Sequence, residues 1–216
     1  MDLALNAIAR KVALSFSLLL ASARLATAQS GSLYFAGGTA TDSSSGPLDT
    51  LGAGITYNSP RMGGFFETIG ADAIFFRNLG VGTEYSFRKD QGPYAGIRYR
   101  PTFYDVNAVY HPISGVRRIS PEIQAGFGRI NVNFYDTPQF CLTAPQGCSA
   151  PNAEISSVDH FQLHLAGGVR FYIIKGLFLR PQLDMHWVRN FTEFGSSWVP
   201  EYTVALGYTH TLRRGH

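Results

Sequence analysis

Two long runs of alternating residue character, joined by a very short link, constrain this chain more than any other feature. Residues 158–174 place apolar side chains on one parity and polar or small side chains on the other, and the alternation resumes over residues 177–188. A period of two is the period of a β-strand. The stretch therefore predicts a long antiparallel hairpin with one apolar face and one charged face. The apolar set is Phe161, Leu163, Leu165, Val169, Phe171 and Ile173, then Leu179, Leu183, Met185 and Trp187.

The length of both arms indicates where such a hairpin is stable. Strands of soluble proteins usually have about 5 or 6 residues, whereas a tilted strand that crosses a bilayer needs about 9 to 11. The polar parity carries Arg170, Arg180 and Asp184 in mid-strand, which suits a dry soluble core poorly. It suits the polar lumen of a transmembrane barrel whose apolar residues face lipid.

The composition agrees with one all-β domain. The chain has 216 residues, of which 45% are hydrophobic and 15% charged, and it contains 23 Gly, 16 Phe and 11 Tyr. Aromatic residues favour strands, glycines are common in turns, and the composition lacks the Ala, Glu, Leu and Lys bias of a helical protein. The formal net charge is only +3, without a basic cluster, so we expect no nucleic-acid partner.

Residues 1–28 have the three parts of a secretory signal peptide. Arg10 and Lys11 precede the apolar stretch Val12–Ala23, and Ala26-Thr27-Ala28 forms an A-x-A cleavage site. The apolar stretch is shorter than the roughly 17 to 25 residues of a spanning helix. We therefore expect export, with residues 29–216 forming the mature barrel domain.

Six further segments alternate like the hairpin arms and bring the expected strand count to eight. They are residues 32–41, 64–76, 79–87, a strand within 94–110, 118–134 and 201–212. We expect a bulge or the end of regular pairing at Pro101, and a bulge near Arg129, where the apolar parity changes. Short links follow the second, fourth and sixth strands, as in outer-membrane barrels. The predicted fold is an eight-stranded antiparallel up-and-down transmembrane β-barrel, closed because open edges are unstable in lipid.

The inward parity of this barrel collects charged residues. They are Asp72, Glu84, Asp105, Glu122, Arg170, Arg180, Asp184 and Glu201. Because eight strands enclose about enough room for side chains, and buried charges are normally paired, we predict a lumen filled by ion pairs. A conducting pore would need a gap in this filling.

Two stretches resemble strands of known small barrels: Leu79–Phe87, reading LGVGTEYSF, and Tyr104–Tyr110, reading YDVNAVY. On these patterns residues 29–216 resemble the small eight-stranded outer-membrane proteins of the OmpA-type transmembrane domain and OmpW-like group. The resemblance implies the outer membrane of a Gram-negative bacterium, contact with its lipid and lipopolysaccharide, and insertion by the barrel-assembly machinery. Many such barrels end in an aromatic residue, whereas here the last aromatic is Tyr208 and the chain ends at His216. We expect no cell-wall anchoring through a peptidoglycan-binding domain after the predicted barrel.

Histidines and possible catalytic residues do not form a recognisable site. His160 and His164 are roughly 13 Å apart on one strand, too far to share one ion. His164 and His186 can meet across the hairpin, but no cysteine joins them, so we expect no metal ion and no cofactor. Pieces of a catalytic triad occur at His186, Glu193, Ser196, Ser197 and His210. The ending Tyr208-Thr209-His210-Thr211 lacks the His-x-Ser-Asn pattern of lipid A deacylases. We therefore predict no catalytic residues and no enzymatic activity.

Cys141 and Cys148 lie in the longest irregular segment, residues 136–157. In an exported chain such a pair predicts a disulfide that ties down a loop, with two free thiols as the alternative.

These features predict an outer-membrane β-barrel with a structural or surface-interaction role and a plugged lumen, whose extracellular partner the sequence does not identify. Three alternatives stay open. The first is narrow-pore transport of small solutes. The second is a secreted lipocalin-like barrel, with the apolar parity turned inward around a ligand. The third is a lipid A-modifying enzyme.

Overall fold

The computed structural model describes residues 29–42, 47–49, 56–58, 61–94, 97–112, 118–135 and 153–211. The predicted signal peptide, Cys141 and Cys148 lie outside these residues, so the signal peptide and the disulfide stay predictions. None of the helical residues described here forms a segment long and apolar enough to cross a membrane.

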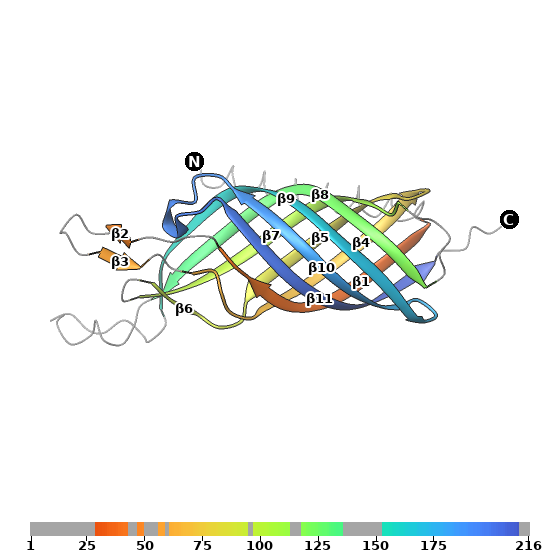
Figure 1. The fold of residues 1–216 in the computed structure, drawn as a ribbon, viewed down its shortest axis with the longest axis horizontal. Coiled ribbons are helices and arrows are strands. Elements are labelled where there is room, and N and C mark those ends of the chain that lie inside the picture. The colour runs from red at the N-terminus through yellow and green to blue at the C-terminus, as the bar shows by residue number, and fades with distance from the viewer. Residues whose placement is uncertain are drawn as a thin grey trace, which may run out of the picture.

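Eight long antiparallel strands close into a barrel (Figure 1), which confirms the fold predicted from the alternation. Each long strand pairs with the next one along the chain, and β1 pairs with β11 to complete the ring. The bounds are β1 (Ser30–Ala40), β4 (Phe66–Phe76), β5 (Leu79–Arg88), β7 (Ile97–Tyr110), β8 (Ile119–Tyr135), β9 (Glu154–Ile174), β10 (Leu177–Val188) and β11 (Trp198–Thr211). Closure leaves none of these eight strands with an unpaired edge along the barrel wall.

The two ends of the barrel differ in their connections. At the right in Figure 1, β4 and β5 are joined through Arg77 and Asn78, and β9 and β10 through Lys175 and Gly176. Lys175 and Gly176 have positive φ angles of 21° and 94°, as a two-residue hairpin turn requires. We call this the short-turn end. The opposite, long-loop end carries the short strands β2 (Pro47–Asp49), β3 (Thr56–Asn58) and β6 (Gly92–Tyr94) and the 3-10 helix η2 (Thr192–Phe194).

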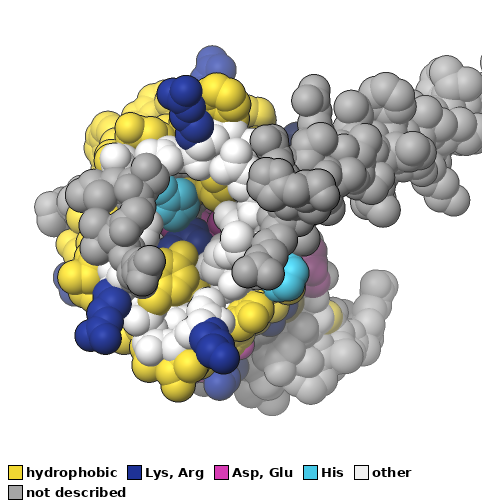
Figure 2. Space-filling model, turned by 90° about the vertical axis from the view of Figure 1, so that its right-hand side faces the viewer, with side chains coloured by type: hydrophobic (Ala, Val, Ile, Leu, Met, Phe, Trp, Pro, Cys, Tyr) yellow, Lys and Arg dark blue, Asp and Glu magenta, His cyan; other side chains and the backbone are white. Residues whose placement is uncertain are grey.

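Apolar side chains cover the outside of the wall and charged side chains lie inside it. Leu33 is 70% exposed and Phe127 60%, whereas Arg170 and Arg180 are each 1% exposed. Viewed from the short-turn end, hydrophobic side chains ring the outside, and basic, acidic and histidine side chains are visible within the ring (Figure 2). The lipocalin-like alternative is therefore wrong, because it requires the apolar parity to face inward.

The bulge predicted near Arg129 is wrong. β8 pairs with β7 and with β9 in continuous register through residues 129–133, and Arg129 stays on the exposed side. Ile130, Val132 and Phe134 share the inward parity of Glu122, because the interior itself changes from polar to apolar towards the long-loop end. The apolar residues of β8 therefore change parity at this point, although each parity of the strand keeps facing the same side of the wall.

Pro101 causes no bulge. β7 continues through Pro101, which lies opposite Val132 of β8 without a shift in register. On its other edge, β7 pairs with β5 over residues 102–110 and with β6 over residues 97–99. Proline has no N–H to donate, so it is tolerated at this point where β7 changes partners. The predicted end of regular pairing thus applies to one edge of β7.

Candidate functional site

Three groups of side chains fill the lumen in succession from the short-turn end to the long-loop end. The arginine layer comprises Asp72, Glu84, Glu122, Arg170 and Arg180. The histidine layer comprises Asp105, His164, Asp184, His186 and Glu201. The apolar plug comprises Ala40, Met62, Phe66, Tyr99, Phe103, Ile130, Val132, Phe134, Val188, Phe191, Phe194 and Val199.

Arg170 of β9 connects three strands in the arginine layer. Its Nη2 donates to Asp72 Oδ2 of β4 at 2.6 Å, and its Nη1 donates to Ser32 Oγ of β1 at 2.8 Å. Its Nε donates to Glu122 of β8. Attraction to carboxylates on two sides offsets the cost of burying the positive charge of a guanidinium group. Arg170 thus ties opposite sides of the wall together through the centre.

Arg180 of β10 extends the same network. Its Nη1 donates to Glu122 Oε1 at 2.7 Å and its Nη2 to Glu84 Oε1 at 2.9 Å. Tyr34 donates its hydroxyl hydrogen to the same Glu84 oxygen at 2.7 Å. Glu122 therefore accepts from both arginines, and the five charged groups form one connected unit across the lumen.

Aromatic rings fill the space beside the two guanidinium groups. The Cζ atom of Arg180 lies 3.9 Å from the ring centroid of Tyr34, and that of Arg170 lies 4.7 Å from the ring of Phe178. Both rings are buried. Cation–π contacts of this kind are strongest where water is excluded. They leave little room for solvent in the arginine layer.

His164 anchors the histidine layer from β9. Its Nε2 lies 2.9 Å from Asp184 Oδ1 of β10, and its Nδ1 lies 2.9 Å from Asn107 Oδ1 of β7. Gln182 donates to Asp184 Oδ1 at 2.6 Å and to Glu84 Oε1 at 3.2 Å. The amide of Gln182 therefore joins the histidine layer to the arginine layer.

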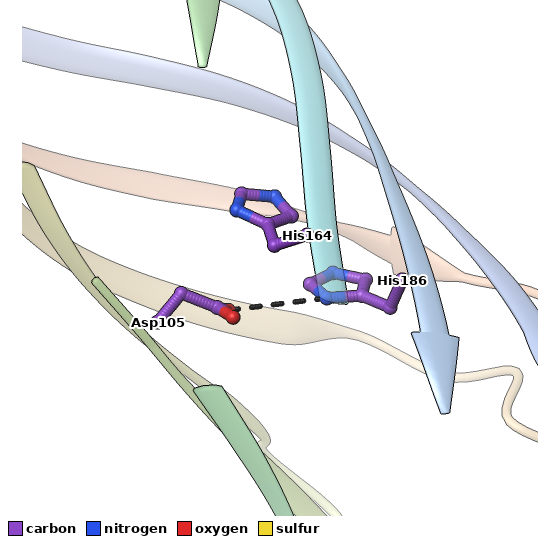
Figure 3. Close-up of side chains that lie close together, drawn as sticks. All are labelled: Asp105, His164 and His186. Atoms are coloured by element: carbon purple, nitrogen blue, oxygen red, sulfur yellow. Dashed lines mark ion pairs between the residues drawn. The ribbon is translucent and has the colours of Figure 1, made fainter. Parts of the chain in front are cut away.

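His186 of β10 lies directly across from His164 and faces a carboxylate at each ring nitrogen. Its Nδ1 lies 3.9 Å from Asp105 Oδ2 and its Nε2 lies 3.3 Å from Glu201 Oε2. Figure 3 shows Asp105 and the two histidines lying close together on different strands. Glu201 accepts a hydrogen bond from Ser86 Oγ at 2.7 Å, and Asp105 accepts one from Gln162 at 2.7 Å.

The apolar plug lies beyond the histidine layer, towards the long-loop end. Its aromatic rings contact one another, with Tyr99 and Phe194 at 5.2 Å and Phe66 and Phe103 at 5.9 Å between ring centroids. Phe103 also stacks on His186 at 4.4 Å. Phe194 reaches the plug from η2, so a segment of the long-loop end folds into the barrel mouth.

All eight residues proposed as lumen ion-pair candidates are buried inside the barrel. The arginines contact only Asp72, Glu84 and Glu122 among them. Asp105, Asp184 and Glu201 face histidines instead. The carboxylates thus divide between two kinds of cationic partner, a division that parity alone does not reveal.

Sequence reasoning missed the neutral polar and apolar parts of the lumen. Asn107, Gln124, Gln162 and Gln182 connect the charged groups and are all on the inward parity, which was the available signal. The apolar plug was missed because its β8 residues were interpreted as a change of parity.

The triad pieces are not brought together. His186 is enclosed in the lumen, and Glu193 pairs with His160 at 3.3 Å. Ser196 precedes β11 at the long-loop end, whereas His210 lies near the end of β11, opposite Gly31. No Ser-His-carboxylate arrangement therefore forms from these pieces.

Two sets of side chains have the donor atoms of a metal site. In one, Asp105, His164 and His186 each offer a ligand atom, and these atoms lie within 4.8 Å of one another. Glu84, His164 and Asp184 form the other set. The hairpin predicted the meeting of the two histidines, but Asp105 reaches them from across the lumen, on a strand far away in sequence.

Comparisons with known proteins identify the fold. The chain matches no protein-family model and no curated protein sequence. Its fold is similar to that of Neisserial surface protein A, with a TM-score of 0.57, 12% identity and coverage of 82% of this chain and 96% of that one. The N-terminal β-barrel domain of Pseudomonas aeruginosa OprF gives a TM-score of 0.51 at 10% identity, covering 85% and 98%. Outer membrane protein OprG of Pseudomonas aeruginosa gives 0.50 at 12% identity, covering 86% and 98%. The chain thus has the fold of small eight-stranded outer-membrane β-barrels.

Proposed function

We propose that this protein spans the outer membrane of a Gram-negative bacterium as a closed, non-conducting barrel with a structural or surface-interaction role. The exposed apolar band around a wall without free edges supports this location, because lipid excludes unpaired backbone groups. Residues 1–28 would direct export, and the barrel-assembly machinery would insert the mature chain. The short-turn end would then face the periplasm and the long-loop end the exterior.

The filled lumen is the main observation that supports a closed, non-conducting barrel. The arginine layer crosses the lumen through Glu122, which contacts both Arg170 and Arg180. The apolar plug then excludes water and ions near the long-loop end. An ion would have to displace buried charge pairs and pass tightly packed aromatic rings, both of which are costly. This arrangement disfavours narrow-pore transport.

The same geometry disfavours the lipid A-modifying alternative. Such an enzyme needs a nucleophile, a base and an orienting group within hydrogen-bond reach, where the acyl chains arrive. His186 is turned into the lumen, and Glu193 is paired with His160. We therefore propose that the barrel is not an enzyme.

The long-loop end supplies a surface for lipopolysaccharide. Arg98, Arg129 and Arg189 are exposed towards this end, where the outer leaflet would place its phosphate groups. Guanidinium groups bind phosphates through paired hydrogen bonds. The surface-interaction role thus includes the surrounding lipid, while a protein or ligand outside the cell would bind the connections beyond it.

Planar-bilayer recording tests the closed state. The mature chain, refolded in detergent and checked by heat-modifiable gel migration, should give no stepwise conductance in potassium chloride. A refolded barrel of known conductance serves as the positive control for insertion. Reproducible single-channel steps from the wild-type protein would contradict the proposal. Release of acyl chains from lipopolysaccharide by the same preparation would instead support the enzyme.

A further inference from the structure

We propose that Asp105, His164 and His186 bind a divalent transition-metal cation inside the lumen. This site goes beyond the proposed function and does not depend on whether the barrel conducts. The three side chains come from β7, β9 and β10 and lie close together (Figure 3). Their nearest ligand atoms lie within 4.8 Å of one another, and Nδ1 of His186 is 3.9 Å from Oδ2 of Asp105. Two imidazoles and one carboxylate form a recurring ligand set for such cations.

Each of the three ligands has a polar partner at another atom. Gln162 holds Oδ1 of Asp105 at 2.7 Å, which leaves Oδ2 facing the histidines. Glu201 lies 3.3 Å from Nε2 of His186, on the side away from Asp105. Asp184 lies 2.9 Å from Nε2 of His164, and a cation at Nδ1 would replace the present 2.9 Å contact of that nitrogen with Asn107 Oδ1. Carboxylates placed behind metal-binding histidines fix the tautomer and the ring orientation, so this arrangement is typical of a built site.

His186 is the side chain that most lacks a partner. It is only 2% exposed, and neither of its ring nitrogens makes a hydrogen bond within the described part of the chain. A buried nitrogen without a hydrogen bond costs about 1 to 3 kcal/mol. A cation bound between Nδ1 and Asp105 would satisfy one nitrogen, and the N–H at Nε2 could then donate to Glu201. One bound ion would thus give both ring nitrogens of His186 a partner.

The charge balance of the lumen also favours a cation. Six carboxylates are buried in the described barrel, against two arginines. Arg170 and Arg180 contact Asp72, Glu84 and Glu122, so Asp105, Asp184 and Glu201 have only histidines as cationic partners. Buried carboxylates without a counter-charge are costly. A divalent cation in the histidine layer would offset this local excess of negative charge.

The histidine layer has room for a single small ion. A cavity of about 10 Å³ is bordered by Asp105, His186 and Glu201 but not by His164, which would have to move towards an ion bound there. A volume of this size holds about one water-sized particle. Metal–ligand distances of about 2.0 to 2.2 Å would draw the three side chains closer together than they lie without an ion. Because the layer is enclosed on both sides, we expect the cation to enter while the barrel folds.

The ligand chemistry narrows the choice of ion. Imidazole nitrogens suit Zn²⁺, Co²⁺, Ni²⁺ and Cu²⁺, whereas Ca²⁺ and Mg²⁺ prefer sites made of oxygen atoms. Zn²⁺ is therefore a suitable probe for stoichiometry. Co²⁺ is a suitable probe for coordination, because its visible absorption reports the ligand geometry.

To test this site, the mature full-length barrel is refolded with Zn²⁺ or with a chelator. Free metal is then removed, and the bound zinc is measured by elemental analysis. We expect about one Zn²⁺ per folded wild-type chain, and at least about tenfold weaker retention in His186→Gln and His164→Gln. The matched controls are His160→Gln and His210→Gln, which replace histidines outside the site and should retain the metal. Folding of every variant is checked by heat-modifiable migration.

Folded wild-type protein that retains no Zn²⁺ would overturn the proposal. Equal loss of metal in the His160→Gln control would also overturn it, because binding would then not require this site. If both variants at the site fail to fold, the Co²⁺ spectrum of the wild-type protein decides. Visible bands of four- or five-coordinate Co²⁺ with nitrogen ligands support the site, and the spectrum of hydrated Co²⁺ contradicts it.

Discussion

The imidazole rings of His164 and His186 stack across β9 and β10, with 4.7 Å between their centroids and 13° between their planes. Phe103 stacks on His186 in turn, at 4.4 Å. The histidine pair therefore forms the boundary between the charged lumen and the apolar plug. The interior changes from ionic to apolar at this contact.

Arg170 should be among the residues on which stability depends most. Replacing it in Arg170→Met leaves Asp72 without an arginine and removes one of the two arginine contacts of Glu122. Breaking a buried ion pair by removing one partner costs about 3 to 5 kcal/mol. We expect a loss of this size in the free energy of unfolding, measured by urea titration in lipid vesicles.

Arg98→Met is the matched control for this prediction, because Arg98 is exposed on the outside of β7. A surface substitution of this kind usually changes stability by no more than about 0.5 kcal/mol. Equal losses in the two variants would contradict a special contribution from the arginine layer.

Glycines on β8 and β9 should differ sharply in their tolerance of a methyl group. A Cβ atom added at Gly128 would collide with the backbone carbonyl oxygen of Tyr104 on β7, whereas one added at Gly167 meets no atom within 4 Å. Because backbone cannot move aside easily, we expect Gly128→Ala to destabilise the barrel by about 1 to 3 kcal/mol. Gly167→Ala should be close to neutral. Urea titration of the two variants compares them, and a larger loss for Gly167→Ala would contradict the packing described.

Lipopolysaccharide should stabilise the barrel through the arginines near the long-loop end. The double variant Arg98→Gln/Arg129→Gln removes two exposed guanidinium groups from this region. We expect it to lose most of the increase in melting temperature that lipopolysaccharide gives to the wild-type protein. Arg77→Gln/Lys175→Gln, at the short-turn end, is the control with the same charge change and should keep the increase. The reverse pattern would indicate the opposite orientation in the membrane.

The sequence allowed the wall of the barrel to be predicted well, because one face of every strand meets a uniform apolar surrounding. Leu163, Leu165 and Phe127 are outward in the prediction and in the structure. Strand ends differed by one to a few residues, as for β9, which extends back to Glu154. Ends depend on local hydrogen bonding, which residue periodicity does not record.

The arrangement inside the lumen was less predictable. Parity placed Asp105 and His186 in the interior, but their approach depends on the closure of the barrel, which brings β7 opposite β10. At Ile130 an apolar side chain faces inward, so the rule that polar residues line the lumen failed there. The interior is not a uniform environment, because it changes from charged to apolar along its length.

The direction in which the apolar band faces decides whether this barrel spans a membrane. Leu165 is 57% exposed near the middle of β9, and Ile155 lies on the same strand and parity, roughly 33 Å away at the rise of a strand. A single tryptophan at either position, in a Trp187→Phe/Trp198→Phe background, reports its surroundings in vesicles. We predict that brominated acyl chains quench the Leu165→Trp fluorescence and leave Ile155→Trp accessible to aqueous acrylamide. Quenching of Leu165→Trp by acrylamide, with no effect of brominated lipid, would contradict a barrel that spans the membrane.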